Sequence, residues 1–384
     1  MKVVYFVHDL HDPTVARRVA MFKAAGMSVV LAGFTRGRSG AHTVEALRPF
    51  ELGATHDARL VSRIWAVFAA LLRVIPRARQ YRHVDVFVAR QLETLLVAAF
   101  ANWLSGSRAP LVFECVDIHR LMVRGDAVGV TLRAIENFLL RRTSLLLVSS
   151  LAFVERYFGH HYDRVPPVHL LENKMLAEEV ASFENRTIGP PTTAGPPWRI
   201  GWYGVIRCPR SLEALAELVR SEPRLVEVTI AGRIAENLTG LFEDVISRSL
   251  GMSFLGPFDR SRDLASLYRS VHFNWMVDYF DEGANSDWLL PNRLYEGGYF
   301  RCVPIGRRDS EVGRWLQGAR VGILLPDPVE AGLASALKAM SVDAYKAQRK
   351  RMNAIPNTAF VATEGDYVAV RQWLEGIGSA AKIG

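Results

Sequence analysis

Cysteine is scarce in this chain of 384 residues, which contains only Cys115, Cys208 and Cys302. The three lie about 90 residues apart, a spacing that fits neither a zinc site nor a disulfide framework and that indicates a reducing compartment. A secretory signal is also lacking, because His8 and Asp9 interrupt the apolar run at the N-terminus. We therefore expect a cytoplasmic protein.

Two common nucleotide-binding motifs are absent as well. The first apolar strand is followed by HDLHDP and not by the GxGxxG glycines that let a pyrophosphate approach the backbone. No Walker-type GKS or GKT is present. These absences disfavour a Rossmann dehydrogenase and a P-loop enzyme.

What is present is the pattern of a two-domain α/β protein. About half of the residues, 49%, are hydrophobic, which is enough for two sizeable cores at this length. Apolar runs of strand length alternate with amphipathic helical stretches, as in parallel α/β architectures. The segment NRTIGPPTTAGPPW is rich in proline and glycine and is typical of a linker. We expect a first domain over 1–184, this linker over 185–198, a second domain over 199–360 and a last helix over 361–384.

The expected strands follow from the apolar runs. They are 2–7, 28–32, 84–89, 111–115, 145–148 and 168–170 in the first domain, and 199–203, 226–231, 253–255, 272–275, 303–306 and 322–325 in the second.

Four segments of the chain resemble glycosyltransferases of the GT-B fold. The most specific is DWLLPNRLYEGGYFRCVP, residues 287–304, where Leu-Tyr-Glu precedes glycines and an apolar strand. The others are IGWYGVIRCPRSLEAL from Ile200, the N-terminal strand and helix, and LVFECVDIHR from Leu111. The chain most resembles bacterial exopolysaccharide glycosyltransferases of the succinoglycan type, in the glycogen-synthase-like group. This implies two Rossmann-like domains facing each other across a cleft, with the C-terminal helix crossing back to the first.

The resemblance implies that the second domain binds a nucleotide-sugar. Glu296, expected at or near a helix start, would hold the ribose, and Arg210, six positions after Gly204, would contact the diphosphate. Guanidinium groups suit this leaving group because they stabilise its negative charge. Further contacts are expected from Arg207, Arg233, Glu282, Asn285, Ser286, Asn292 and Arg293. No DxD dyad is placed to bind a metal, so we expect no metal and no cofactor. The alternative for the loop arginines is simple solvation.

The sequence departs from the family pattern at three positions. Trp288 stands eight residues before Glu296, where the group has another glutamate. Val205 replaces the arginine that normally follows the loop glycine, and Arg207 is the expected substitute. Arg301 stands where a glycine is usual.

Polar residues end two strands of the first domain. Asp9 follows the first strand, and Asp117 and His119 follow LVFEC. Open α/β sheets bind ligands at the carboxyl ends of their strands, so these residues are candidates to contact an acceptor sugar. Asp117 or His119 could also serve as general base if the reaction inverts configuration. The alternative role is helix capping, by His119 and by Asp12 ahead of Pro13.

Positive charge is concentrated in the first half of the chain. Residues 1–172 contain 22 Lys+Arg against 14 Asp+Glu, whereas 173–384 contain 25 of each. The stretch 58–83 has six arginines and no acid, and Arg59, Arg63 and Arg73 fall within about 80° of helix circumference. This stripe is a candidate to bind phosphates of an anionic membrane. The alternative is a core-packed helix with a solvated stripe.

The sequence therefore predicts an enzyme that moves a sugar from a UDP-sugar to a lipid-linked saccharide in exopolysaccharide synthesis. It would act peripherally on the inner face of the bacterial plasma membrane. One alternative is a nucleotide-sugar epimerase or hydrolase on the same fold. Another is a non-enzymatic basic protein that binds nucleic acid, which is disfavoured because the aromatics are not interleaved with the arginines as stacking platforms.

Overall fold

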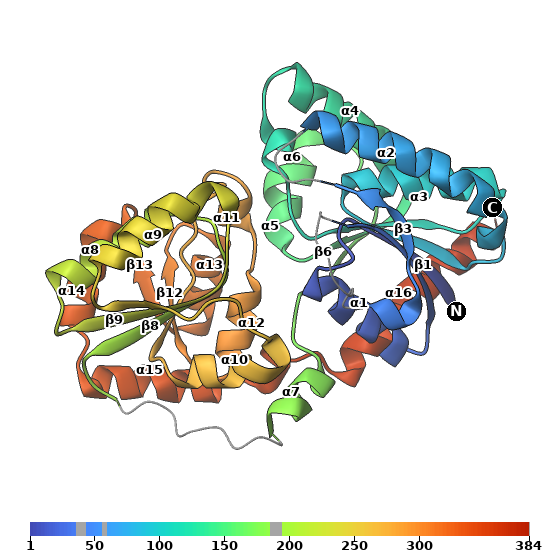
Figure 1. Cartoon of the computed structure of the whole chain (residues 1–384). Coiled ribbons are helices and arrows are strands. Elements are labelled where there is room, and N and C mark those ends of the chain that lie inside the picture. Colours follow the sequence, from blue (N-terminus) through green and yellow to red (C-terminus); the bar gives the residue numbers. More distant parts are fainter. Residues whose placement is uncertain (36–43, 56–59, 185–193, 384) are drawn as a thin grey trace. The chain divides into compact units, whose positions relative to one another are not determined.

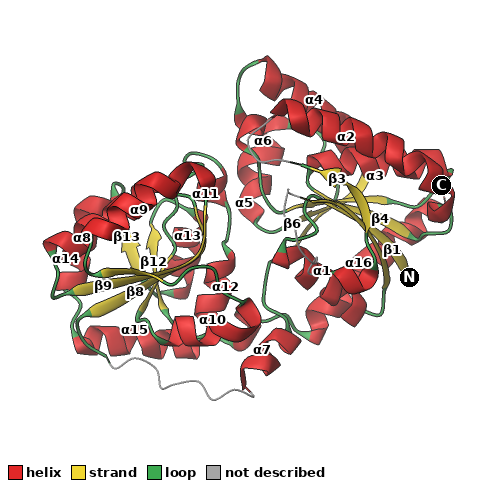
Figure 2. Ribbon diagram, viewed as in Figure 1, coloured by secondary structure: helices red, strands yellow, loops and turns green. Residues whose placement is uncertain are grey.

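The computed structural model describes residues 1–35, 44–55, 60–184 and 194–383. They form two compact units, each with one parallel β-sheet covered by helices (Figures 1 and 2). Unit 1 consists of Met1–Glu172 and Thr363–Gly384, and unit 2 of Asn173–Ala362. The predicted α/β class is confirmed.

The described part of unit 1 has a seven-stranded sheet in the order β3-β2-β1-β4-β5-β6-β7. Its strands are β1 (Lys2–Val7), β2 (Ser28–Thr35), β3 (Phe50–Ala54), β4 (Val86–Arg90), β5 (Leu111–Cys115), β6 (Thr143–Val148) and β7 (Val168–Leu170). The central strands β4 and β5 are buried on both faces, which explains why they are apolar except for Arg90 and Glu114 near their carboxyl ends. The strand order reverses between β1 and β4, the point at which such sheets bind ligands.

Helices flank this sheet. They are α1 (Pro13–Ala24), α2 (Leu60–Val74), α3 (Leu92–Ser105), α4 (Ala127–Leu140), α5 (Leu151–Phe153), α6 (Gly159–His161) and α16 (Glu364–Ile383), with 3-10 turns at Ile75–Tyr81 and Arg120–Val123. The α1 helix begins after Asp12, whose Oδ1 accepts a 2.8 Å hydrogen bond from the Thr14 amide, with Pro13 at the first helical position. This confirms the capping role of Asp12.

The last helix, α16, belongs to unit 1, as the GT-B class predicts. The Trp373 ring stacks on His169 with 4.3 Å between centroids. Arg371 Nη1 donates a 3.5 Å hydrogen bond to the Ala25 carbonyl at the end of α1. The C-terminal segment is therefore tied to both the sheet and the first helix of unit 1.

Unit 2 has a six-stranded sheet in the order β10-β9-β8-β11-β12-β13, which corresponds to the 3-2-1-4-5-6 order of Rossmann sheets. The strands are β8 (Trp198–Ile206), β9 (Val226–Ile234), β10 (Met252–Phe254), β11 (Phe273–Trp275), β12 (Val303–Arg307) and β13 (Ile323–Leu325). The helices are α7 (Ala177–Glu184), α8 (Pro209–Ser221), α9 (Thr239–Arg248), α10 (Arg260–Arg269), α11 (Asn285–Trp288), α12 (Asn292–Tyr299), α13 (Glu311–Ala319), α14 (Val329–Lys338) and α15 (Val342–Ala354).

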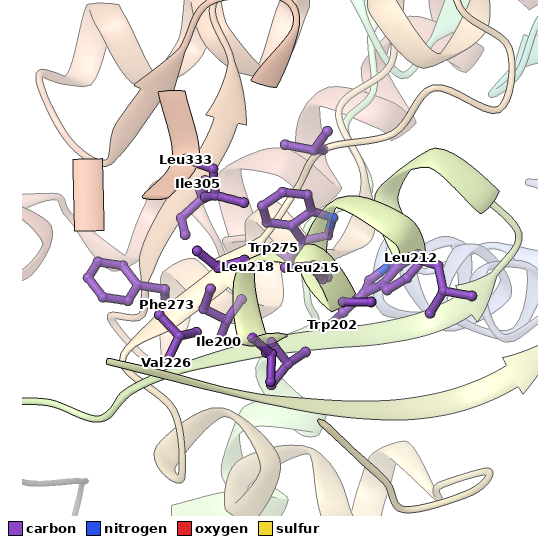
Figure 3. Close-up of a cluster of buried hydrophobic side chains, with 14 of the residues drawn as sticks. Ile200, Trp202, Leu212, Leu215, Leu218, Val226, Phe273, Trp275, Ile305 and Leu333 are labelled. Atoms are coloured by element: carbon purple, nitrogen blue, oxygen red, sulfur yellow. The ribbon is translucent and has the colours of Figure 1, made fainter. Parts of the chain in front are cut away.

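One hydrophobic core of unit 2 lies between the sheet and α8. Trp202 of β8 and Trp275 of β11 are fully buried with Leu212 and Leu215 of α8 (Figure 3). The apolar residues of α8 recur at three- and four-residue spacing, so one face of this helix packs on the sheet. The helix starts at Pro209, beside the carboxyl end of β8.

The observed domain boundaries differ from the expected ones. Unit 1 ends at Glu172 instead of 184, because α7 packs on α10 of unit 2 and Phe183 joins its core. The chain returns to unit 1 at Thr363. Most of the expected linker, residues 185–193, lies outside the described residues.

The DWLLPNRLYEGGYFRCVP segment also differs locally from expectation. Glu296 is the fifth residue of α12 and not at its start, and the two glycines that follow are helical. They permit close packing: a Cβ on Gly297 would lie 2.1 Å from Asn274 Nδ2, and one on Gly298 2.2 Å from the Phe360 ring. Arg301, with φ of 61°, occupies the left-handed position after the helix, where glycine is favoured.

Candidate functional site

The carboxyl end of β8 offers an open stretch of backbone in unit 2. Gly204 has a φ of 119°, which glycine adopts without strain, and no described atom lies within 4 Å of the place where its Cβ would be. A Cβ on the neighbouring Gly232 would lie 1.8 Å from the Gly204 carbonyl oxygen, so the strands touch there. Arg233, the residue after Gly232 in β9, is exposed and pairs with Val205 of β8. The site can thus receive a bulky ligand close to the Gly204 backbone.

Arg207 and Arg210 both contact the segment that follows β11. Arg207 Nη2 donates to Asp278 Oδ2 at 3.1 Å. Arg210, in the first turn of α8, donates from Nε to Glu330 Oε1 at 2.7 Å, and its guanidinium carbon lies 3.8 Å from the centre of the Tyr279 ring. Both side chains remain about one-third exposed, 30% and 36%. They are therefore oriented, yet accessible to an anion.

The DYFDEGANSDW loop contributes one accessible carboxylate. Glu282 lies 3.5 Å from Arg210 Nη1 and 3.6 Å from Arg307 Nη2, and half of its side chain is exposed. Asn285 and Ser286, predicted to bind sugar hydroxyls, are buried instead. Ser286 Oγ accepts a 2.9 Å hydrogen bond from the Asp281 amide, so it shapes the loop.

Glu296 is close to this cluster but is covered. Its carboxylate forms an ion pair with Arg260, at the start of α10, and accepts a 3.4 Å hydrogen bond from the Tyr268 hydroxyl. Only 3% of its side chain is exposed. A ribose can reach Glu296 only if the Arg260 side chain moves aside.

The two residues at the start of α12 also lie in this region. Asn274 Nδ2 donates to the Arg293 carbonyl at 2.7 Å, which anchors the helix start to β11. Burial and nearby Arg207 lower the pKa of Arg293, against the opposing effect of Asp278. The Asn292 Oδ1 atom is buried and has no hydrogen-bond partner among the described residues. It is an acceptor available to a ligand.

Sequence reasoning missed Arg307, the last residue of β12. Its Nη1 donates to Asp287 Oδ1 at 2.5 Å, and its Nη2 to Asp327 Oδ2 at 2.7 Å. The guanidinium carbon lies 4.2 Å from the centre of the Tyr279 ring, whose hydroxyl also donates to Asp327 at 2.5 Å. Arg307 thus holds together the loops after β11 and β13. The available signal was an arginine at the carboxyl end of a buried strand.

In unit 1 a buried charge cluster lies at the carboxyl ends of β4 and β5. Glu114 Oε1 accepts from Arg18 Nε at 2.6 Å and from Arg90 Nη2 at 2.9 Å, and Oε2 accepts from the Tyr5 hydroxyl at 2.5 Å. Burial alone would raise the pKa of Glu114, but Arg90 and Arg18 outweigh it and hold the pKa at about 2. Because Glu114 is 1% exposed, it serves the structure of the sheet edge and does not face a ligand.

Asp9 is also buried, in the loop after β1. Its Oδ1 accepts a 3.0 Å hydrogen bond from the His11 amide and lies 3.5 Å from His11 Nδ1. In the same loop His8 Nε2 lies 3.4 Å from Asp12 Oδ2. Burial would raise the pKa of Asp12, yet His8 and Arg90 hold it well below its usual value. The loop is therefore a preorganised turn beside the switch point.

Asp117 and His119 line a pocket of about 280 Å³, and Asp9 is not among its lining residues. At its rim, Arg63 Nη2 donates to Glu93 Oε1 at 2.7 Å, and Arg63 Nη1 lies 3.3 Å from His119 Nε2. His119 Nδ1 caps the following 3-10 turn by accepting from the Leu121 amide at 3.2 Å. Burial and the Arg63 charge lower the pKa of His119, so its imidazole is neutral near pH 7.

The carboxyl of Glu136, in the wall of the same pocket, has a raised pKa. Glu136 of α4 is 3% exposed, and its Oε2 accepts hydrogen bonds from the Tyr157 hydroxyl at 2.6 Å and from Tyr162. Burial raises the pKa of Glu136 from 4.5 to about 7, against the lowering effect of the two hydroxyls and of Arg133. The folded protein therefore keeps a proton that the unfolded chain releases.

Glu136→Gln should flatten the pH dependence of stability. Since the raised pKa stabilises the fold below pH 4.5 and this contribution is lost as the pH rises through 7, wild type should lose about 3 kcal/mol between pH 5 and 8 through this group. The glutamine variant should not. Urea unfolding at both pH values measures this, with the exposed Glu375→Gln as control. Equal losses in wild type and Glu136→Gln would contradict the raised pKa.

Two arginines of the predicted stripe make contacts within unit 1, and its binding to membrane phosphates stays a prediction. Arg63 pairs with Glu93, and Arg73 Nη1 donates to the Leu52 carbonyl of β3 at 2.6 Å. Arg59 lies outside the described residues. Arg73 nevertheless remains exposed and the Arg63 side chain is partly exposed, and α2 also exposes large apolar side chains.

The described residues contain no group of three or more His, Cys, Asp or Glu side chains arranged to hold a metal ion. Within the same residues, no helix combines the length and apolarity needed to cross a membrane.

The chain resembles several known proteins. No family model matches it. The succinoglycan biosynthesis protein ExoL of Rhizobium meliloti (strain 1021) is 40% identical over 355 residues, which cover 92% of this chain and 88% of that protein. The lipopolysaccharide outer core galactosyltransferase WaaB is 10% identical, with a TM-score of 0.66 over 98% of this chain and 99% of WaaB. Anabaena HepE, solved in complex with UDP, is 12% identical, with a TM-score of 0.61 over 99% of this chain and 98% of HepE. At these low identities, the two structures establish the shared fold.

Proposed function

The chain belongs to the family of the succinoglycan biosynthesis protein ExoL of Rhizobium meliloti, and on this premise we propose that it is a glycosyltransferase of exopolysaccharide synthesis. It moves a sugar from a UDP-sugar to a lipid-linked saccharide. Unit 2 binds the donor and unit 1 the acceptor. The binding of UDP by HepE, which shares the fold, supports the choice of base.

The observation that carries the proposal is the cationic group beside Gly204. Departure of the sugar leaves a UDP diphosphate, whose charge needs fixed cations or a helix N-terminus. Arg207 and Arg210 supply two guanidiniums at the start of α8, and the open Gly204 backbone lets the diphosphate approach. These groups do the work of a metal ion, so the reaction needs no metal and no cofactor. Glu296, Asn292 and Arg293 of α12 bind the nucleoside end of the donor, and Glu282 and Arg233 border it.

Arg210→Ala should weaken UDP binding about tenfold, the value expected for losing one charge-assisted contact of about 1.4 kcal/mol. Isothermal calorimetry with UDP measures this. The matched control is Arg220→Ala, at the other end of the same helix, where the half-exposed arginine pairs with Glu217 at 2.8 Å. Identical UDP affinities for Arg210→Ala and Arg220→Ala would contradict the diphosphate assignment.

The acceptor hydroxyl is activated in unit 1. His119 is neutral near pH 7 because of burial and Arg63, and a neutral imidazole can accept the hydroxyl proton if configuration inverts. Asp117, which lines the same pocket as His119, is the other candidate for this step. Asp9 orients the neighbouring loop through the His11 amide.

The protein acts in the cytoplasm at the inner face of the plasma membrane. The support is the excess of positive charge in residues 1–172, 22 basic against 14 acidic, which favours an anionic surface. A lipid-linked acceptor is also confined to that surface.

A further inference from the structure

The outer face of α2 is an exposed apolar strip. Ile64, Trp65, Phe68 and Leu72 are between 53% and 66% exposed. At 100° per residue they lie within about 100° of the helix circumference. The Trp65 and Phe68 rings contact each other edge to face, 6.2 Å between centroids. In a soluble protein a strip of this kind normally marks an interaction surface.

The helix α4 lies near α2 (Figure 1), lines the same pocket and also exposes apolar side chains. Val130 and Phe138 are both more than half exposed, and Ile135 is 36% exposed. The Arg142 guanidinium carbon lies 3.7 Å from the centre of the Phe138 ring, so a cation borders the apolar area. We name Ile64, Trp65, Phe68, Leu72, Val130, Ile135 and Phe138 together the α2–α4 surface.

The 280 Å³ pocket opens on the α2–α4 surface. Ile64 and Ile135 belong both to this surface and to the pocket lining. The interior is walled by hydrocarbon side chains: Val67, Leu92, Leu96, Phe113, Ile118 and Leu132. Arg63 pairs with Glu93 and lies near His119, and the carboxyls of Asp117 and Glu136 also belong to the lining. An apolar cavity with a cation beside it suits a hydrocarbon chain that carries phosphate.

We propose that this pocket holds a segment of the hydrocarbon chain of the lipid-linked acceptor, and that the α2–α4 surface rests on the membrane from which the chain is drawn. The inference rests on the proposed function for the presence of a lipid on the acceptor. The phosphate next to the chain lies near Arg63. The pocket volume is at the lower end of ligand pockets, so it takes only part of the chain while the remainder stays in the bilayer.

The positive charge around the α2–α4 surface favours a membrane over a protein partner. The stretch 58–83, which contains α2, has six arginines and no acid, and Arg142 borders the surface on α4. Aromatic and aliphatic residues on one face with arginines around them are the features of helices that lie in the interface of an anionic bilayer. Hydrocarbon walls also disfavour a free sugar, whose hydroxyls need hydrogen-bond partners.

The pocket is tested with farnesyl phosphate, a short isoprenoid phosphate. Leu132→Trp fills the interior with an indole. Ile135→Trp narrows the opening, and because Ile135 is exposed, the substitution should not disturb the packing of the core. Each should weaken farnesyl phosphate binding at least tenfold in calorimetry with the full chain. Leu250→Trp, on a fully exposed residue of unit 2, is the matched control and should change nothing. Unchanged affinity in Ile135→Trp and Leu132→Trp would overturn the proposal.

Farnesol and inorganic phosphate distinguish binding of the hydrocarbon chain from binding of the phosphate headgroup. Farnesol should bind more weakly than farnesyl phosphate yet remain sensitive to Leu132→Trp, and inorganic phosphate should not compete. Arg63→Gln should reduce binding of farnesyl phosphate but not of farnesol. Inorganic phosphate competing as effectively as farnesyl phosphate would show an anion site only and would overturn the proposal.

The surface is tested by co-sedimentation with phosphatidylglycerol vesicles. Phe68→Glu should lower the pelleted fraction several-fold relative to wild type, whereas Leu250→Glu should not. A wild type that stays in the supernatant would assign the surface to another partner and overturn the membrane part. UDP affinity, which depends on unit 2, is measured on every variant. If wild type does not bind UDP, the proposed donor is refuted, whereas the result with farnesyl phosphate still holds.

Discussion

Replacing Glu296 by glutamine is expected to lower UDP affinity about tenfold, since the variant keeps an acceptor oxygen but loses the charge, which supplies about half of the roughly 3 kcal/mol that two ribose hydrogen bonds contribute. Glutamine keeps the volume of the side chain and can still accept from the Tyr268 hydroxyl, so the fold should be retained. Calorimetry with UDP measures the loss. The same variant should lose sugar transfer in proportion.

Arg260→Ala is the variant that decides what Glu296 does. Arg260 covers the Glu296 carboxylate in the structure, and its removal exposes the carboxylate to the ribose. UDP affinity should then be equal to that of wild type or higher. If Arg260→Ala loses UDP as strongly as Glu296→Gln, Glu296 serves to hold Arg260 and the ribose role is refuted.

Glu114→Ala is expected to have the largest effect on stability, a loss of about 3–5 kcal/mol. The variant leaves Arg90, which is fully buried, and Arg18, which is 4% exposed, without the carboxylate that they share. Urea unfolding followed by circular dichroism measures the loss. The cause is the two buried guanidinium charges that are left without a compensating carboxylate, more than the loss of a contact.

The control for this prediction is an exposed ion pair of the same unit. Glu375→Ala removes the 2.8 Å partner of Arg371 on α16, where both side chains are nearly half exposed. Such pairs contribute about 0.5 kcal/mol or less. A Glu114→Ala variant no less stable than Glu375→Ala would contradict the burial and pairing of the Glu114 cluster.

The sequence predicted the architecture well because buried parallel strands are unbroken apolar runs. Residues 2–7, 111–115 and 168–170 are strands with the expected bounds. The strand β3 was missed because it is a half-exposed edge strand, FELGA, with a glycine and a glutamate. The domain boundary was misplaced because α7 has no compositional signal, whereas the proline-rich segment after it does. The predicted family is confirmed by the 40% identical relative.

The site was predicted in part, and the errors have a common origin. Spacing placed Arg207, Arg210 and Glu282 in one region, and they share it. Spacing could not show that Arg260, far upstream in sequence, covers Glu296, or that Arg307 joins Asp287 and Asp327. It also could not show which side of α2 packs inward. An interfacial helix and a core-packed helix were both open for this stretch; Ile64, Trp65 and Phe68 are exposed, which excludes core packing of that face.

The central claim is that unit 2 binds a UDP-sugar whose sugar passes to a lipid. Its direct test follows radiolabel from UDP-glucose and UDP-galactose in the presence of EDTA, with the purified chain and membranes from cells that lack its gene. Label should enter the fraction extracted by organic solvent with wild type and not with Glu296→Gln. Release of label as free sugar, or as a different UDP-sugar, with none in the lipid, would contradict the account.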